Sequence, residues 1–65
     1  MRIKELRKEA NLTQIQVAEA LGVNQSTVCS WELGSAMPRA ELLPKLAELF
    51  QCTIDALFGR DQNTA

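Results

Sequence analysis

The chain has 65 residues, a formal net charge of −1 at pH 7 and no histidine. A chain of this length folds as one domain and buries only about 60% of the surface that its unfolded form exposes, so a deep enclosed active site is hard to build. No cysteines and carboxylates cluster at metal-ligand spacing, and no nucleophile has a base partner in the sequence. We therefore expect no catalytic site, no metal and no cofactor, and we expect the protein to act through surface recognition.

The two cysteines, Cys29 and Cys52, are far apart in the sequence, and no secretory signal precedes them. No apolar run approaches the ~20 residues that a membrane-spanning helix needs. The first ten residues, MRIKELRKEA, lack the apolar middle of a signal peptide. Together these features predict two reduced thiols in a cytoplasmic protein.

The first predicted helix covers residues 2–10, where three apolar side chains at spacings of three and four share one face: Ile3, Leu6 and Ala10. The same segment carries the four basic residues Arg2, Lys4, Arg7 and Lys8. We expect these cations to form a solvated face, except Arg7, which falls near the apolar stripe. The next basic residue is Arg39, so the long segment between residues 8 and 39 has no cationic side chain.

The second predicted helix is the most clearly marked one. Thr13 is its expected N-cap, and Gln16 three residues later completes a capping box that satisfies two backbone donors. Its predicted apolar stripe consists of Ile15, Ala18 and Leu21. Gly22 ends this helix, because glycine adopts the left-handed conformation of a helix C-terminus most readily.

The third predicted helix begins after its cap, Asn24. At ~100° per residue, Val28 and Trp31 fall on one side and therefore face the core. Asn24 and Glu32 lie on that same side. The opposite side consists of Ser26, Cys29, Ser30 and Leu33. Gln25 lies at the border of the two sides, in the first turn, so uncharged amides and hydroxyls face outward.

After the third helix ends at Gly34, a loop containing Pro38 leads to a fourth predicted helix over residues 40–50. A start near Ala40 or Glu41 places Pro44 in the first turn, where proline is tolerated. The apolar residues of this helix are Leu42, Leu43, Leu46, Ala47 and Phe50.

A short fifth helix is predicted between its cap, Thr53, and its stop, Gly59. Leu57 and Phe58 at its end either complete the core or contact a second subunit. Cys52, just before it, is expected to be packed. The polar residues 61–65 are expected to form a short tail outside the domain.

The second and third helices, joined by a tight turn at Gly22, have the layout of a helix-turn-helix. Glutamine can bond N6 and N7 of adenine with the two ends of its amide, and serine and threonine can donate or accept at base edges. The N-terminus of a helix carries partial positive charge, which suits an approach to phosphates. The outward row of amides and hydroxyls therefore predicts contact with base pairs. The alternative is an ordinary solvated first turn, and the net charge of −1 argues mildly against nucleic-acid binding.

Residues 12–50, LTQIQVAEALGVNQSTVCSWELGSAMPRAELLPKLAELF, resemble the Cro and phage-repressor helix-turn-helix family, also called the XRE family. The motifs that carry the resemblance are the leading LTQ, then Ala18, Gly22 and Val28, then WELG and a proline. The resemblance extends over residues 3–58 and implies a compact all-α, five-helix, lambda-repressor-like domain over residues 1–60. It further implies a repressor-like regulator that binds double-stranded operator DNA as a homodimer, with the third helix in the major groove.

The resemblance also implies roles for single residues. The implied DNA-binding set is Gln14, Asn24, Gln25, Ser26, Thr27, Cys29, Ser30 and Arg39. Within this set, Gln25, Ser26 and Ser30 match base-reading positions. Gln14 matches a residue that touches phosphate, and Arg39 matches one that reaches the DNA backbone or the minor groove. Arg7 and Glu32 match an ion pair between the first and third helices.

The sequence departs from the family at Leu33 and in the SAM loop at residues 35–37, where many relatives have polar or basic residues. The electrostatic affinity for DNA is therefore expected to be low. The rival interpretation is a helix-turn-helix module that binds another protein, such as an antitoxin or anti-repressor component, and Leu33 and Met37 favour it. For Cys29, a small contact residue is favoured over a redox sensor.

Overall fold

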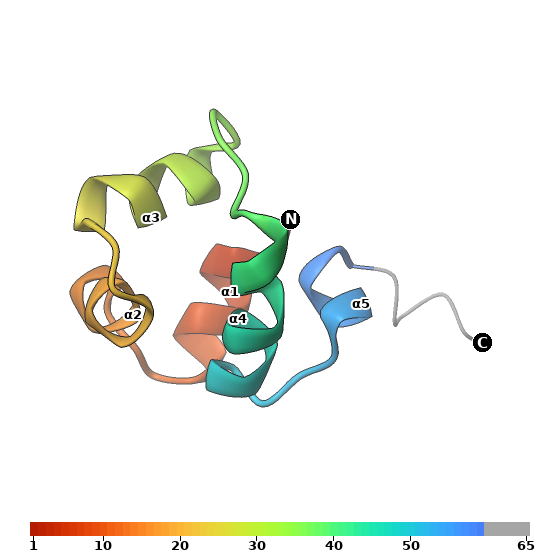
Figure 1. Ribbon diagram of the computed structural model, residues 1–65. Coiled ribbons are helices and arrows are strands. Elements are labelled where there is room, and N and C mark those ends of the chain that lie inside the picture. The colour runs from red at the N-terminus through yellow and green to blue at the C-terminus, as the bar shows by residue number, and fades with distance from the viewer. Residues whose placement is uncertain (60–65) are drawn as a thin grey trace.

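The computed structural model describes residues 1–59, which form five α-helices and one 3₁₀ helix (Figure 1). The α-helices are α1 (Ile3–Glu9), α2 (Gln14–Leu21), α3 (Gln25–Leu33), α4 (Leu43–Leu49) and α5 (Ile54–Leu57), and the 3₁₀ helix is η1 (Ala40–Leu42). None of these residues forms a strand. The predicted all-α, five-helix fold is thus confirmed, whereas the predicted tail at residues 61–65 lies outside the described residues.

Local hydrogen bonds set the ends of α2 as predicted. Oγ1 of Thr13 accepts from the backbone N–H of Gln16 at 3.0 Å, and Oε1 of Gln16 accepts from the backbone N–H of Thr13 at 2.8 Å. Gly22, with φ of 72°, ends α2, and Gly34, with φ of 83°, ends α3. Asn24 occupies the N-cap of α3, but its side chain makes no capping hydrogen bond.

The segment predicted as one helix over residues 40–50 is divided in two. A 3₁₀ turn, η1, comes first, and the α-helical hydrogen bonding of α4 begins at Leu43. Pro44 lies in the first turn of α4, where its missing N–H leaves no intrahelical hydrogen bond unmade. The side chain of Thr53 caps α5 by accepting from the N–H of Ala56 at 3.0 Å.

One apolar core joins all the helices. Its buried members are Ile3, Leu6, Val17, Ala18, Val28, Trp31, Leu42, Leu46, Ala47, Phe50 and Leu57. Val28 and Trp31 lie in it, as the helical spacing predicts. Leu57 completes the core, whereas Phe58 remains partly exposed, and Cys52 packs against the core. Lys4 and Lys8 are exposed, while Arg7 is half-buried.

The predicted apolar stripe of α2 is wrong in one position. The side chain of Ile15 is 52% exposed, whereas Val17, left out of the stripe, is fully buried. The two residues lie ~200° apart on the helix, so they cannot face the same core. Because α2 packs against both α3 and α4, its buried face is centred on the adjacent positions Val17 and Ala18.

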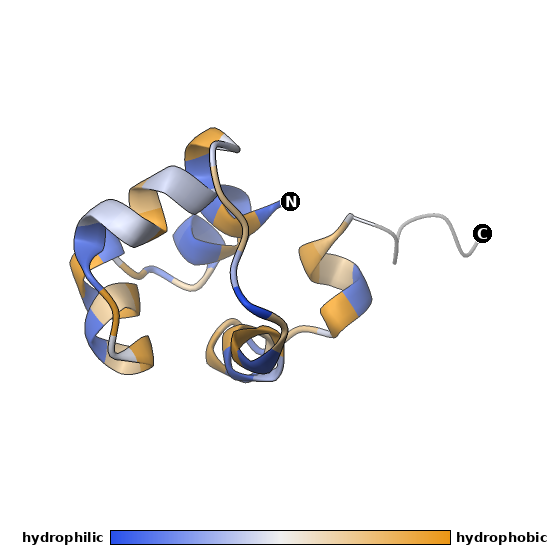
Figure 2. Cartoon of the chain, turned by 45° about the horizontal axis from the view of Figure 1, so that its top comes forward, coloured by the Kyte–Doolittle hydropathy of each residue, from blue (hydrophilic) through white to orange (hydrophobic). Residues whose placement is uncertain are grey.

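The helix pair α2 and α3 forms one side of the molecule, and α5 lies on the opposite side (Figure 1). α1 packs against α3. α4 packs against both α2 and α5 and so lies between them. Figure 2 shows that polar residues run along most of α3. Across residues 1–59, every helix falls short of the length and apolar character that crossing a membrane requires.

The corrected stripe of α2 can be tested with two substitutions in one helix. Val17→Ala removes two methyl groups from the core and should lower the free energy of unfolding by ~2 kcal/mol, including the cavity that it leaves. Ile15→Ala at an exposed position should change it by less than ~0.5 kcal/mol. Urea denaturation of both variants measures the difference, and equal losses would mean that Ile15 is buried after all.

Candidate nucleic-acid interface

The outward side of α3 presents a short polar row at the molecular surface. Asn24, Gln25 and Ser26 at the start of the helix are exposed. Thr27, Cys29 and Ser30 are half-buried, so Cys29 is less exposed than its place on the outer side of the helix predicted. The first turn of α3 therefore offers the most accessible polar groups of the row.

Serine hydroxyls in this row are partly engaged by the helix itself. The hydroxyl of Ser30 donates to the carbonyl oxygen of Ser26 at 3.0 Å, and the hydroxyl of Ser35 donates to the carbonyl oxygen of Ser30 at 3.3 Å. The Ser30 oxygen keeps its acceptor lone pairs, while its proton is committed to the backbone. The exposed hydroxyl of Ser26 and the amide of Gln25 are therefore the better donors toward a ligand.

Two glutamines join the first turns of α2 and α3. Nε2 of Gln25 donates to Oε1 of Gln14 at 3.3 Å. Both side chains begin at a helix N-terminus, Gln14 as the first residue of α2 and Gln25 as the first residue of α3. The contact brings the two helix N-termini to one surface, where unpaired backbone N–H groups attract anions.

Beneath this surface lies an ion pair between α1 and α3. Nε of Arg7 donates to Oε2 of Glu32 at 2.6 Å, and Nη2 of Arg7 donates to Oε1 of Glu32 at 3.3 Å. The two side chains are only 12% and 4% exposed. Nη1 of Arg7 also donates to the carbonyl oxygen of Leu12 at 2.9 Å, which ties the loop between α1 and α2 to the pair.

The ion pair is connected to the glutamines above it. Nε2 of Gln14 donates to Oε1 of Glu32 at 3.0 Å. Burial by itself raises the pKa of Glu32, but hydrogen bonds from Arg7 and Gln14 and the charge of Arg7 outweigh it and lower that pKa below its ordinary value. The carboxylate is therefore ionised at neutral pH. Sequence reasoning gave Gln14 only a phosphate contact, and its link to Glu32 depends on tertiary packing that no local pattern reveals.

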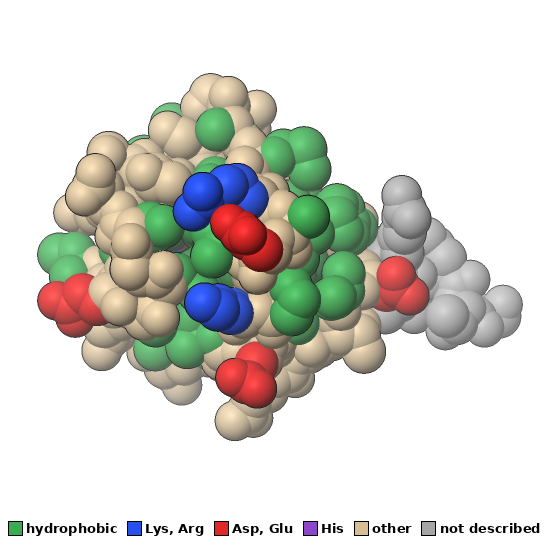
Figure 3. Space-filling view, in the orientation of Figure 1, with side chains coloured by type: hydrophobic (Ala, Val, Ile, Leu, Met, Phe, Trp, Pro, Cys, Tyr) green, Lys and Arg blue, Asp and Glu red, His purple; other side chains and the backbone are tan. Residues whose placement is uncertain are grey.

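Arg39 lies outside α2 and α3, but it lines the same surface depression as Thr27 of the implied set. It precedes η1, and its Nε lies 3.5 Å from Oε1 of Glu41 in an exposed pair. Figure 3 shows the same interleaving on a larger scale, with the basic side chains of this face next to acidic ones. Glu41 was absent from the sequence-based set, although its spacing of two residues from Arg39 allowed the pairing to be foreseen. The cationic charge near α3 is therefore partly offset.

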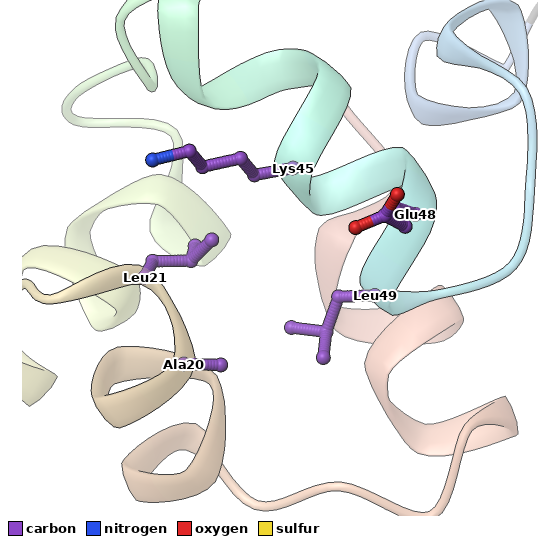
Figure 4. Close-up of a pocket in the computed structure, with 5 residues that line it drawn as sticks. All are labelled: Ala20, Leu21, Lys45, Glu48 and Leu49. Atoms are coloured by element: carbon purple, nitrogen blue, oxygen red, sulfur yellow. The ribbon is translucent and has the colours of Figure 1, made fainter.

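Two depressions mark the surface near these elements. One, of about 330 Å³, lies between α3 and the loop before η1, and its lining includes Thr27, Trp31, Met37 and Arg39. The other, of about 480 Å³, lies between α2 and α4 (Figure 4). Ala20 on α2 and Leu49 on α4 point toward one another across it, and Leu21, Lys45 and Glu48 complete its lining. None of the implied DNA-binding residues lines this second depression.

The buried ion pair makes a strong prediction for stability. Arg7→Ala leaves the Glu32 carboxylate buried without its cation and should lower the free energy of unfolding by ~3–5 kcal/mol. Arg39→Ala, which breaks an exposed pair, is the matched control and should cost ~0–1 kcal/mol. Urea denaturation distinguishes the two. Equal midpoints for the two variants would show that burial of the Arg7–Glu32 pair has no energetic consequence.

Comparison with known proteins places the chain in a family. The family model described as "Helix-turn-helix" matches residues 3–57. The chain is similar to the HTH-type transcriptional regulator AnsR of Bacillus subtilis, with 41% identity over 61 residues, or 94% of this chain and 53% of that protein. It is also similar to the transcriptional repressor RstR of the cryptic phage CTXphi of Vibrio cholerae, with 38% identity over 92% of this chain and 57% of that protein.

A third relative is close to this chain in length. It is an HTH-type transcriptional regulator of Archaeoglobus fulgidus that is 36% identical over 61 residues, or 94% of this chain and 86% of that protein. By contrast, the chain spans about half the length of AnsR and RstR. No solved structure matches the chain significantly. The family match over residues 3–57 and the 36% identity to the archaeal regulator show that the chain belongs to the helix-turn-helix family.

Proposed function

We propose that this chain is the DNA-binding domain of a repressor-like transcriptional regulator and that α3 reads operator sequence from the major groove. The observation that carries the proposal is the exposed amide of Gln25 at the start of α3, bonded to Gln14 at the start of α2. Similarity to AnsR and to the phage repressor RstR, which are named as transcriptional regulators, supports the same role. Such a domain acts on chromosomal or phage DNA in the cytoplasm and catalyses no reaction.

The proposed base contacts follow from the exposure of the row. Gln25 is the principal reader, because its amide presents a donor and an acceptor in one plane and matches the major-groove edge of adenine. Ser26 adds a single hydrogen bond at a neighbouring base. The exposed Asn24 and the partly covered side chains of Thr27, Cys29 and Ser30 lie beside them and tune the fit by contact.

The proposed phosphate contacts are few. Gln14 uses one hydrogen of its amide nitrogen for Glu32 and retains a second for a phosphate oxygen. The helix N-termini add backbone N–H groups. Arg39 is the one cation of the proposed set, and Glu41 partly offsets it. We therefore assign the affinity mainly to specific contacts and to the pairing of two chains, rather than to a large electrostatic attraction.

A second candidate function is docking to another protein, as in an antitoxin or anti-repressor component. Two exposed apolar side chains near the end of α3 favour it: Leu33, which is 77% exposed, and Met37. This candidate predicts that the binding surface is centred on the C-terminal half of α3 rather than on Gln25.

Substitution of Gln25 separates the two candidates. Gln25→Ala should leave thermal stability nearly unchanged, because the side chain is exposed. It should weaken binding to the preferred duplex by ~1–3 kcal/mol per half-site and flatten the preference at one base pair. Affinity for a scrambled duplex should hardly change. The experiment selects the preferred duplex from a random pool with the parent chain, then titrates both proteins against both duplexes.

If Gln25→Ala keeps the full sequence preference of the parent chain, Gln25 does not read the DNA sequence. If the parent chain itself enriches no sequence from the random pool, the DNA-binding proposal fails and the docking candidate replaces it.

We further propose that the chain binds its operator as a homodimer through α5. Ile54 is the first residue of α5, and Phe58, its C-cap, follows four residues later, so the two partly exposed side chains share one face. The backbone N–H of Arg2 donates to the carbonyl oxygen of Leu57 at 2.8 Å, which brings the exposed Met1 to the same end of the molecule. Hydrophobic side chains gather over and beside α5 in Figure 3. This apolar surface suits a second copy related by the two-fold axis of an operator.

The dimer can be tested on an operator with two half-sites about one helical turn apart. Sedimentation should show two parent chains per duplex, bound cooperatively. Ile54→Asn should reduce that cooperativity about tenfold, since it removes one apolar contact per chain. Ile15→Asn, at a similarly exposed isoleucine on α2, should leave it intact. A single tightly bound parent chain per duplex, or equal losses for the two variants, would rule out the α5 dimer.

A further inference from the structure

Four side chains from three helices form one continuous line of hydrogen bonds. It begins at Arg7 on α1, passes through Glu32 on α3 and Gln14 on α2, and ends at Gln25 on α3. The successive donor–acceptor distances are 2.6, 3.0 and 3.3 Å. The line starts inside the protein, where the ion pair is nearly covered, and ends on the surface at Gln25, which is exposed.

The chemistry of these groups permits only one direction of donation along the line. The guanidinium of Arg7 only donates, and the ionised carboxylate of Glu32 only accepts. Gln14 must therefore turn its NH₂ toward Glu32, and its carbonyl oxygen is left for Gln25. That oxygen only accepts, so Gln25 must turn its own NH₂ toward Gln14. The buried carboxylate of Glu32 thus determines that the exposed amide of Gln25 turns its NH₂ toward Gln14 and leaves its carbonyl oxygen free.

We propose that Glu32, held in place by Arg7, is a positioning residue that fixes the amide orientation of Gln25 and thereby its choice of adenine over guanine. This inference rests on the proposed function, because it concerns the same reading residue. It adds that the selectivity of Gln25 is set from inside the protein, by a carboxylate that never touches DNA.

The base edges show why the orientation matters. Adenine presents N7 as an acceptor and N6 as a donor in the major groove, whereas guanine presents acceptors at both N7 and O6. With its nitrogen anchored on Gln14, Gln25 offers one remaining N–H and a fixed carbonyl oxygen. That pair complements adenine, but against guanine the oxygen meets the acceptor O6. An unanchored amide has both N–H groups free and can turn its NH₂ toward N7 and O6 together, so guanine becomes tolerated.

The test uses three variants with different effects on the line. Glu32→Gln is nearly isosteric but replaces the acceptor-only group by one that can also donate, so the orientation is no longer forced. Gln14→Met keeps the length of the side chain and removes both of its hydrogen bonds while leaving Arg7 and Glu32 paired. Arg7→Lys is the control, because it disturbs the ion pair yet leaves a carboxylate at Glu32. Circular dichroism selects a temperature at which every variant is folded.

The operator is first selected from random duplexes with the parent chain, and the position read by Gln25 is the one whose preference Gln25→Ala abolishes. Competition between duplexes with adenine or guanine there should give a parent preference of about 10- to 100-fold for adenine. Gln14→Met and Glu32→Gln should reduce this ratio below about threefold, by gaining affinity for guanine. Arg7→Lys should keep the parent ratio.

Two results would overturn the inference while leaving the proposed function standing. The first is that Gln14→Met and Glu32→Gln both keep the parent ratio. The second is that the parent chain prefers a base other than adenine at this position. Equal loss of the ratio in Arg7→Lys would also overturn it, because the effect would then follow stability rather than orientation. If the parent enriches no sequence at all, it is the proposed function that fails.

Discussion

A buried ion pair between α1 and α3 holds the proposed binding surface together. Removing a guanidinium and a carboxylate from water is costly, and their attraction compensates only when good geometry and further hydrogen bonds satisfy the remaining polar atoms. Here Arg7 reaches Glu32 through two nitrogens and the Leu12 carbonyl through a third, and Glu32 also accepts from Gln14. Throughout residues 1–59, no buried side-chain nitrogen or oxygen lacks a hydrogen-bond partner. The pair therefore connects α1, α2, α3 and a loop at one point.

This constraint links the fold to the proposed function. The core fixes α3 through Val28 and Trp31 on its inner side, and that placement leaves the polar first turn on the surface. The ion pair then fixes how the first turns of α2 and α3 meet, since Gln14 bonds to Glu32 below and to Gln25 above. A chain with net charge −1 has little general attraction for DNA, so under the proposed function precise placement of a few neutral side chains supplies most of the recognition.

Much of this arrangement was predictable because it is encoded locally. The capping box of Thr13 and Gln16 and the left-handed Gly22 and Gly34 depend on residues within one turn, and the structure has them where the sequence places them. The burial of Val28 and Trp31 follows from helical spacing alone. What failed depends on packing partners. Whether α2 buries Ile15 or Val17 is decided by where α3 and α4 lie, and the 3₁₀ turn of η1 reflects how the loop joins α4.

The candidate site likewise combines features that local sequence predicts with features that depend on tertiary packing. The polar row of α3 could be identified from the sequence, whereas the partial burial of Cys29 could not, because it depends on neighbouring elements. The bond from Ser30 to the Ser26 carbonyl lies within one helical turn, so local spacing allowed it to be foreseen. The connection of Gln25 to the interior was also beyond sequence patterns, because it needs side chains from three helices to meet. The sequence identifies Gln25 as a candidate reader, and the tertiary structure shows which side chains hold it in place.

Whether the first turn of α3 reads DNA sequence can be measured by nuclear magnetic resonance of the glutamine side-chain NH₂ groups and of the leucine and methionine methyl groups. The parent chain is titrated with its selected duplex and, separately, with a scrambled duplex. If α3 reads DNA, the NH₂ signals of Gln25 and Gln14 should shift most, and the Gln25 shift should differ clearly between the two duplexes. Shifts centred on Leu33 and Met37, or identical Gln25 shifts with both duplexes, would contradict it.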